Sequence, residues 1–126
     1  MIFDTDVMIW AQKLNPRALD LIGDAEERAI SAVTYMELLH GSNSKKQLEI
    51  VRGFISEGNF QVLPLSEQIG HRAMGYVEQY SVLSGIRALD ALIAATAVEN
   101  NFMLVSGNVK HYKSLKDLKF KPFKQS

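Results

Sequence analysis

The sequence of 126 residues predicts an α/β fold, a three-layer sandwich in which helices cover both faces of a short, mainly parallel sheet. Two observations lead to this prediction. Short apolar runs alternate along the chain with longer segments whose apolar residues recur at the 3.6-residue period of an amphipathic helix. Strands that are separated by helices pair in parallel and are buried on both faces. The length suits one core, so we expect a single domain spanning residues 1–126.

Each element follows from a local pattern. Five apolar runs are predicted as strands: residues 1–5, 28–33, 60–65, 102–106 and 119–123. The last run contains Pro122, which lacks the N–H group of a ladder hydrogen bond and therefore indicates an edge strand. Six segments have helical patterns: residues 7–14, 16–24, 34–42, 44–58, 66–83 and 88–101.

Capping residues and a proline mark where these helices begin and end. Asp6 is expected to cap the first helix, because an aspartate side chain accepts hydrogen bonds from the free N–H groups of a helix start. Pro16 fits the first turn of the second helix, and Ser66 precedes the long helix of residues 66–83. Gly41 is expected to end the third helix and Asn100 the last.

The composition excludes several classes of protein. With 47% hydrophobic and 22% charged residues, the chain has the balance of an ordinary globular domain. No apolar stretch approaches the length of a membrane span, and the first residues lack the pattern of a secretory signal. The absence of cysteine excludes disulfides and thiolate metal sites. We therefore expect a cytoplasmic protein without membrane contact.

The net charge of zero conceals two oppositely charged parts. Residues 107–126 contain six lysines and a single acidic residue, Asp117, which gives this end a net charge of +5. The remaining residues carry a net charge of −5. Lysines close to a polyanion gain affinity by releasing its counterions. Two interpretations of the lysine-rich end stay open: a solvated tail, and a rim that binds phosphate groups.

The first ten residues, MIFDTDVMIW, place Asp4 and Asp6 inside an apolar run, where an ionised carboxylate is costly unless it is compensated. They follow the first predicted strand, and ligands of open α/β sheets bind beyond the carboxyl ends of strands. Glu37 follows the second strand, and Asp90 lies near the start of the last helix. Each has a structural alternative: Asp6 and Asp90 would stabilise helix starts, and Glu37 would face solvent.

Asp4, Glu37 and Asp90 come from three distant segments, yet all three are expected at the same end of the sheet. Two unit charges about 5 Å apart cost on the order of 3 kcal/mol at an effective dielectric constant of about 20. A hard divalent cation removes this repulsion, and oxygen ligands suit Mg²⁺ or Mn²⁺. Such an ion activates water and stabilises a phosphoryl transition state. We therefore predict a Mg²⁺ or Mn²⁺ site at these three carboxylates.

Four blocks of the sequence resemble the PIN-domain family, and specifically the VapC-type toxins of bacterial and archaeal toxin–antitoxin pairs. The blocks are IFDTDVMIW, SAVTYMELLHG, ALDALIAATA and LVSGN, in the family's order and spacing over nearly the whole chain. The resemblance implies a small α/β sandwich that cuts RNA with Mg²⁺ or Mn²⁺. It also implies a homodimer that is inhibited by a cognate antitoxin protein. We therefore expect a metal-dependent endoribonuclease that hydrolyses an RNA phosphodiester and acts as a toxin.

By position, Asp4, Glu37 and Asp90 correspond to the family's acidic residues, which are catalytic and bind the metal. Asp6 falls at a supporting position, where the family often has Asn, Ser or Asp. The family frequently places a fourth acid after the last main strand, where this chain reads Ser106-Gly107-Asn108. The chain departs from the family pattern there, which leaves open whether one or two metal ions bind.

Further residues near these blocks are predicted to support the site or to contact RNA. Asp6 and Asn108 are expected to orient metal ligands or the attacking water, and Ser106 is expected to support the site. Four side chains are predicted RNA contacts: Arg87, Lys110, His111 and Lys113. For each of these four, an ordinary surface side chain is the alternative interpretation.

Two other functions are alternatives to the nuclease. The run MIFDTDVMIW also resembles the first motif of haloacid-dehalogenase-type phosphatases, in which an apolar strand ends in Asp-x-Asp. Those enzymes have a late acidic pair after a strand, whereas only Glu99 and Asp117 follow Asp90 here, and neither stands at a predicted strand end. A degenerate PIN fold that binds RNA or protein without cleavage is the second alternative. The intact set of three acids argues against it.

Overall fold

The computed structural model describes residues 1–126 and contains a five-stranded sheet in the order β3-β2-β1-β4-β5. All neighbouring strands are parallel. The strands are β1 (Ile2–Phe3), β2 (Ala29–Ser31), β3 (Gln61–Leu63), β4 (Leu104–Ser106) and β5 (Phe120–Pro122). The helices are α1 (Thr5–Gln12), α2 (Pro16–Asp24), α3 (Ala32–His40), α4 (Lys45–Glu57), α5 (Glu67–Ser84), α6 (Ala88–Glu99) and α7 (Val109–Tyr112). The predicted α/β fold with a parallel central sheet is confirmed.

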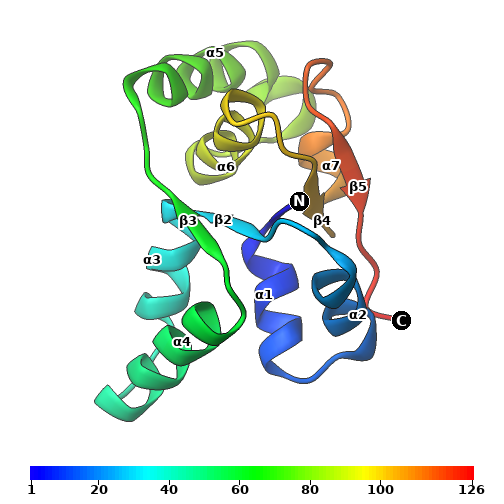
Figure 1. The fold of residues 1–126 in the computed structure, drawn as a ribbon. Coiled ribbons are helices and arrows are strands. Elements are labelled where there is room, and N and C mark those ends of the chain that lie inside the picture. The colour runs from blue at the N-terminus through cyan, green and yellow to red at the C-terminus, as the bar shows by residue number, and fades with distance from the viewer.

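Helices cover both faces of the sheet, with α5 and α6 on one face and α1, α2 and α4 on the other (Figure 1). Because successive strand residues point to opposite faces, Ile2 packs in the core beneath α5 and α6, whereas Phe3 packs in the core beside α1. Leu104 and Val105 of β4 divide in the same way. Full burial of such side chains contributes about 2 kcal/mol each. These contacts hold β1 at the centre of the sheet and fix the position of Asp4 directly after it.

Two helices begin earlier than the sequence predicts. The N-cap of α1 is Asp4, whose Oδ1 accepts a hydrogen bond from the Thr5 N–H at 2.8 Å. The prediction that Asp6 caps this helix is wrong, because Asp6 lies in the first turn. Similarly, Ser31 caps α3 by accepting from the Val33 N–H at 3.1 Å, so this helix starts directly after β2. A side-chain acceptor at the last strand residue, or just after it, satisfies the free N–H groups and lets the helix begin there.

The other helix boundaries largely agree with the sequence. Four predicted boundary residues occupy the expected positions: Pro16, Gly41, Ser66 and Asn100. Pro122 lies in β5, an edge strand, as predicted. The short helix α7 was not predicted, because four residues are too few to show helical periodicity. None of the helices combines the length and apolarity that crossing a membrane requires.

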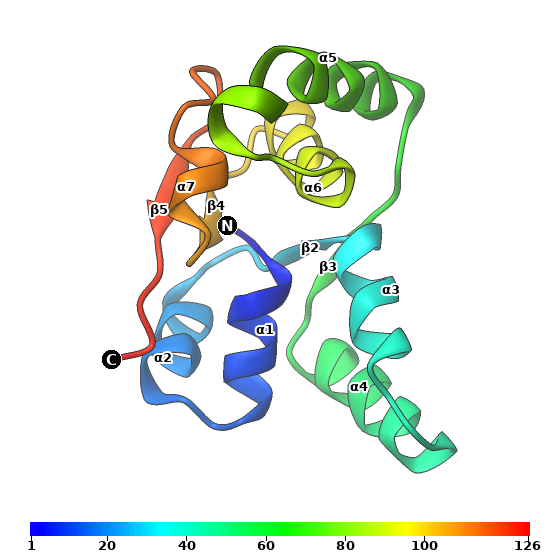
Figure 2. The same cartoon turned by 180° about the vertical axis from the view of Figure 1, so that it is seen from behind.

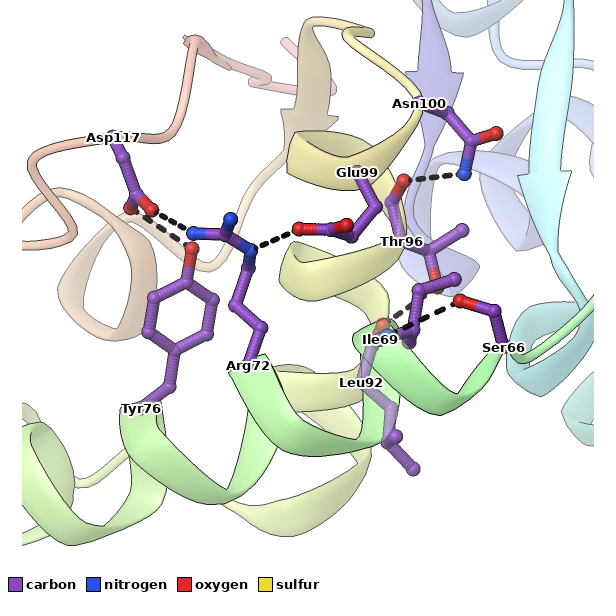
Figure 3. A network of polar contacts seen from close by, with 9 residues as sticks. All are labelled: Ser66, Ile69, Arg72, Tyr76, Leu92, Thr96, Glu99, Asn100 and Asp117. Atoms are coloured by element: carbon purple, nitrogen blue, oxygen red, sulfur yellow. Dashed lines mark hydrogen bonds and ion pairs between the residues drawn. The ribbon is translucent and has the colours of Figure 1, made fainter.

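A polar network ties α5 to the end of α6 and to the loop before β5 (Figure 3). Arg72 donates from Nε to Glu99 Oε2 at 2.6 Å and from Nη1 to the carboxylate of Asp117. Tyr76 Oη donates to Asp117 Oδ1 at 2.8 Å. Burial and the Asp117 carboxylate both raise the pKa of Tyr76, so its hydroxyl stays protonated as a donor. The network therefore connects the lysine-rich C-terminal segment to helices α5 and α6.

Replacing Tyr76 with phenylalanine tests how much this network contributes to stability. The change Tyr76→Phe removes a hydrogen bond to a charged acceptor, so we expect the free energy of unfolding to fall by about 1–2 kcal/mol. Urea denaturation measures the difference. Tyr80→Phe is the matched control, because Tyr80 lies one turn further along α5 and its ring packs against Tyr76. Equal losses in the two variants would show that the bond to Asp117 contributes nothing.

Candidate active site

Four carboxylates line one polar cavity of about 390 Å³ at the carboxyl ends of β1 and β4. Seven residues form its walls, none of them hydrophobic: Asp4, Thr5, Asp6, Glu37, Asp90, Gly107 and Asn108. They come from the start of α1, from α3, from the start of α6 and from the turn after β4. The structure thus brings together the three predicted metal-binding acids, and Asp6 lies with them.

Asp4 is the most deeply buried of the four carboxylates, with 6% of its surface exposed. Its Oδ2 accepts a hydrogen bond from Ser106 Oγ at 2.6 Å, and Ser106 Oγ in turn accepts from the Asn108 N–H at 3.0 Å. Burial raises the pKa of Asp4 to about 6, and the charges of Asp6 and Asp90 add to the rise, while the bonds from Ser106 and the Thr5 N–H oppose it. Ser106 therefore supports Asp4 from behind the cavity.

Asp6 joins the first turn of α1 to the turn after β4. Its Oδ1 accepts from the Val7 N–H and its Oδ2 from the Gly107 N–H, both at 2.8 Å. Burial raises the pKa of Asp6 despite these bonds. A Cβ atom at position 107 would lie 2.8 Å from Asp6 Oδ2 and 3.3 Å from the Phe123 carbonyl oxygen. A larger residue there would force Asp6 Oδ2 to move, so glycine keeps this carboxylate close to the turn.

Two threonines that the sequence analysis did not single out hold Glu37. Thr5 Oγ1 donates to Glu37 Oε1 at 2.7 Å and lies 3.1 Å from Thr34 Oγ1. Since a hydroxyl has one hydrogen, Thr34 donates to Thr5, which in turn donates to Glu37. Thr34 is fully buried and lies three residues before Glu37, one turn away on α3. The three-residue spacing between Thr34 and Glu37 is the only sequence feature that indicates this hydrogen-bonded chain.

Asp90 is held by two consecutive residues of α7. His111 Nδ1 lies 2.8 Å from Asp90 Oδ2, and Tyr112 Oη lies 3.4 Å from Asp90 Oδ1. Burial, together with the charges of Asp4 and Asp90, raises the pKa of Tyr112, so its phenol remains protonated beside them. His111 therefore lies within the site, and Tyr112 is a site residue that sequence reasoning missed because α7 itself was not predicted.

The family model of the PIN domain matches residues 1–115. The chain belongs to the PIN domain family. The resemblance carried by the four sequence blocks is thereby confirmed, and the phosphatase interpretation is set aside.

Solved structures support the same fold for this PIN domain. A toxin–antitoxin complex from Klebsiella pneumoniae is similar at 23% identity with a TM-score of 0.80, covering 99% of this chain and 97% of that one. VapBC2 from Rickettsia felis, bound to a DNA fragment from its promoter, is similar at 25% identity with a TM-score of 0.77, covering 98% and 100%. VapBC-1 from nontypeable Haemophilus influenzae is similar at 24% identity with a TM-score of 0.80, covering 97% and 98%. No curated protein sequence matches the chain.

The donor set of the PIN domain suits a hard divalent cation. All four acidic side chains offer oxygen ligands. Burial raises the pKa of Asp4, and the charges of Asp6 and Asp90 raise it further, so a bound cation would stabilise the ionised carboxylate. As the side chains stand, no three acidic or histidine side chains are placed to hold one ion together. Each carboxylate is instead hydrogen-bonded to the protein. The residues fit the ion by chemistry and charge.

The remaining predicted residues lie around the cavity. Asn108 lines it, whereas Ser106 is buried behind Asp4. Arg87 is the exposed N-cap residue of α6, and its side chain makes no capping hydrogen bond. Lys110 and Lys113 are exposed in α7 and at its C-cap. These three basic side chains do not form the cavity wall, so their role as RNA contacts stays a prediction.

The raised pKa of Asp4 predicts how stability changes with pH in the metal-free protein. The pKa of Asp4 is about 6 in the folded chain, so the folded chain keeps this proton up to about pH 6, whereas the unfolded chain loses it near the ordinary aspartate value of 3.8. The resulting stability is fully present below the unfolded value and is lost as the pH rises through 6. Asp4→Asn lacks this dependence. In EDTA, we expect wild type to lose on the order of 2 kcal/mol relative to Asp4→Asn between about pH 4 and pH 8.

The measurement is thermal melting of both proteins across this pH range. Asp117→Asn serves as the control, because Asp117 is exposed in the network on the helical layer and outside the acidic cavity. Melting temperatures of wild type and Asp4→Asn that run parallel with pH would contradict the burial of an ionisable carboxylate at position 4.

Proposed function

We propose that this PIN domain is a metal-dependent endoribonuclease and the toxin of a type II toxin–antitoxin pair. The observation that carries the proposal is the polar cavity in which Asp4, Glu37 and Asp90 meet at the carboxyl end of the sheet. The similarity in fold to toxin–antitoxin complexes supports the toxin assignment. Residues 1–126 would act as one nuclease domain in the cytoplasm.

In this proposal Asp4, Glu37 and Asp90 hold Mg²⁺ or Mn²⁺, directly or through water. When bound, the ion would lower the pKa of a water molecule and compensate the charge that develops on the phosphoryl group. Hydrolysis forms a bond from the water oxygen to phosphorus and breaks the bond from phosphorus to O3′. A proton reaches the leaving oxygen, so the products carry a 5′-phosphate and a 3′-hydroxyl.

The other residues of the cavity orient the ligands. Ser106 and the Thr5 N–H hold Asp4, and the Thr5 hydroxyl holds Glu37. Asp6 fixes the turn that carries Asn108, whose side chain faces the same cavity. With these partners each carboxylate is oriented before any ion binds, which lowers the cost of assembling the site.

The electrostatics of the cavity also require a cation for RNA to bind. Four carboxylates repel a phosphate group unless positive charge lies between them. The exposed lysines of the C-terminal end would hold the phosphates further along the RNA strand. The acidic cavity and the basic end therefore have complementary roles on one substrate.

Two apolar surfaces support two protein partners. A groove of about 360 Å³ lined by Ile9, Leu38, Ile50 and Val51 shares Glu37 with the acidic cavity, so an antitoxin segment bound there would cover the site. A second apolar hollow, between α5 and α6, contains the exposed side chain of Met74 and supports a homodimer. Both partners are part of the proposal.

A PIN fold that binds RNA or protein without cleavage is the second candidate function. The observation that favours it is the lack of three acidic side chains placed to hold one ion together. The two candidates differ in one outcome, since only the nuclease releases shorter RNA when Mn²⁺ is present.

An RNA cleavage assay tests the proposed activity. We expect the purified chain to cut structured RNA with Mg²⁺ or Mn²⁺ and to lose this activity in EDTA. Asp4→Asn, Glu37→Gln and Asp90→Asn should each lower the rate at least about 100-fold, because each removes a charged ligand of the ion that compensates the transition-state charge. Glu67→Gln is the control, since Glu67 is an exposed residue of α5 whose partner is His71. Cleavage that persists in EDTA would refute the metal mechanism, and RNA binding without cleavage would favour the second candidate.

The salt dependence of RNA binding tests the lysine-rich end. In the Asp4→Asn background, the triple change Lys110→Gln, Lys113→Gln and Lys116→Gln should reduce the slope of log K against log salt by up to about 0.7 per lost contact. Fluorescence anisotropy at several salt concentrations gives this slope.

The control for this experiment replaces Lys45 and Lys46 of α4, which lies far from α7 in both views of the fold (Figures 1 and 2). An unchanged slope in the triple variant would mean that the C-terminal lysines are only a solvated surface.

A further inference from the structure

One ring nitrogen of His111 lies within hydrogen-bond distance of two polar side chains. Its Nδ1 lies 2.8 Å from Asp90 Oδ2 and 2.7 Å from Asn108 Nδ2. The carboxylate needs a donor, whereas an amide nitrogen needs an acceptor. A single imidazole nitrogen is either a donor or an acceptor. The two contacts therefore have only one consistent assignment.

The ionised carboxylate decides which assignment holds. An ionised Asp90 only accepts hydrogen bonds, so His111 Nδ1 carries the hydrogen and donates it. Nδ1 then has no lone pair that could accept a hydrogen bond from Asn108. The Asn108 amide must therefore direct its oxygen toward the ring. This orientation differs from the other only by a flip that exchanges the oxygen and nitrogen positions. The Nδ1–H group is thus shared between Asp90 and Asn108. Hydrogen bonds of this kind to a carboxylate are the stronger ones in proteins.

The surroundings hold the ring in this orientation. The side chains of His111 and Asp90 are each 21% exposed, so both are largely withdrawn from water. On its far side, His111 Nε2 lies 3.7 Å from the place of a Cβ atom at Gly85, in the turn between α5 and α6. The next residue, Tyr112, is fully buried and anchors α7 beside β4 and β5 (Figure 2). Its hydroxyl faces the other oxygen of Asp90.

We propose that His111 is a positioning residue, whose Nδ1–H fixes the orientation of Asp90 and thereby sets the metal affinity of the acidic cavity. This inference rests on the proposed metal site. It concerns only the Nδ1 side of the ring, so contact of His111 with RNA stays a separate prediction. Hydrogen-bond donors to metal-binding carboxylates typically change metal affinity by about 10–100-fold when they are removed.

The protonated nitrogen can be tested in the metal-free full-length chain, independently of any activity. Two-bond nitrogen–proton correlation spectra in EDTA at alkaline pH report which ring nitrogen carries the hydrogen. We expect His111 to have its hydrogen on Nδ1, unlike the exposed His71, which should show the tautomer common in solution. A hydrogen on Nε2 of His111 would overturn the proposal even if the chain proves to be a nuclease.

Amide substitutions test the link to metal binding. In His111→Asn the amide nitrogen occupies the place of Nδ1, whereas in His111→Gln it occupies the place of Nε2. Titration of the melting temperature with Mn²⁺ gives the affinity of each folded variant. We expect His111→Gln and His111→Ala to bind Mn²⁺ at least about 10-fold more weakly than wild type, and His111→Asn to stay within about threefold of it.

A merely structural role would lower the melting temperature in EDTA without producing this difference between the two amides. His71→Ala is the control for loss of a histidine and should leave the Mn²⁺ affinity unchanged. Equal affinities in His111→Asn and His111→Gln would overturn the proposal. A wild-type chain that binds no Mn²⁺ would overturn both this proposal and the nuclease, whereas Mn²⁺ binding without RNA cleavage would count against the nuclease alone.

Discussion

The confinement of like charges at one end of a parallel sheet governs the local design of this PIN domain. Asp4, Asp6, Glu37 and Asp90 share a cavity without an apolar wall, and their repulsion raises the free energy of the folded chain. Each carboxylate accepts hydrogen bonds from nearby groups of the protein. These donors are backbone N–H groups, hydroxyls and one imidazole. These hydrogen bonds stabilise the carboxylates but do not neutralise their charge, so the cavity remains acidic.

The same hydrogen bonds also join the elements of the fold. Asp4 both starts α1 and receives a bond from Ser106 at the end of β4, so one side chain connects two neighbouring strands. Thr5 connects α1 to α3 through Glu37, and His111 connects α7 to α6 through Asp90. A change at any of these positions alters the site and the packing together. Variants of the cavity are therefore informative only when their stability is measured alongside their function.

Features that depend on a short-range sequence pattern, such as the layers of the fold, could be predicted from the sequence. Features that depend on the packing of distant elements could not. Consecutive strand residues such as Ile2 and Phe3 are both apolar and point to opposite faces of the sheet, which predicts helices on both faces. The N-cap of α1 was assigned to Asp6 because two aspartates one residue apart fit the same pattern, and only the short length of β1 selects Asp4. The contact of Thr5 with Glu37 exists because α1 packs on α3, which no local spacing shows.

The order of the strands has a consequence for a chain that emerges gradually from the ribosome. β1 precedes the other four strands in the sequence, yet it lies between β2 and β4, and β4 begins only at Leu104. The turn after β4 supplies Gly107 and Asn108 to the cavity and receives Asp6 from the other end of the chain. A nascent chain that stops before β4 therefore has an incomplete cavity. All seven wall residues are present only once Asn108 has been made, so the acidic cavity forms late in the synthesis of this domain.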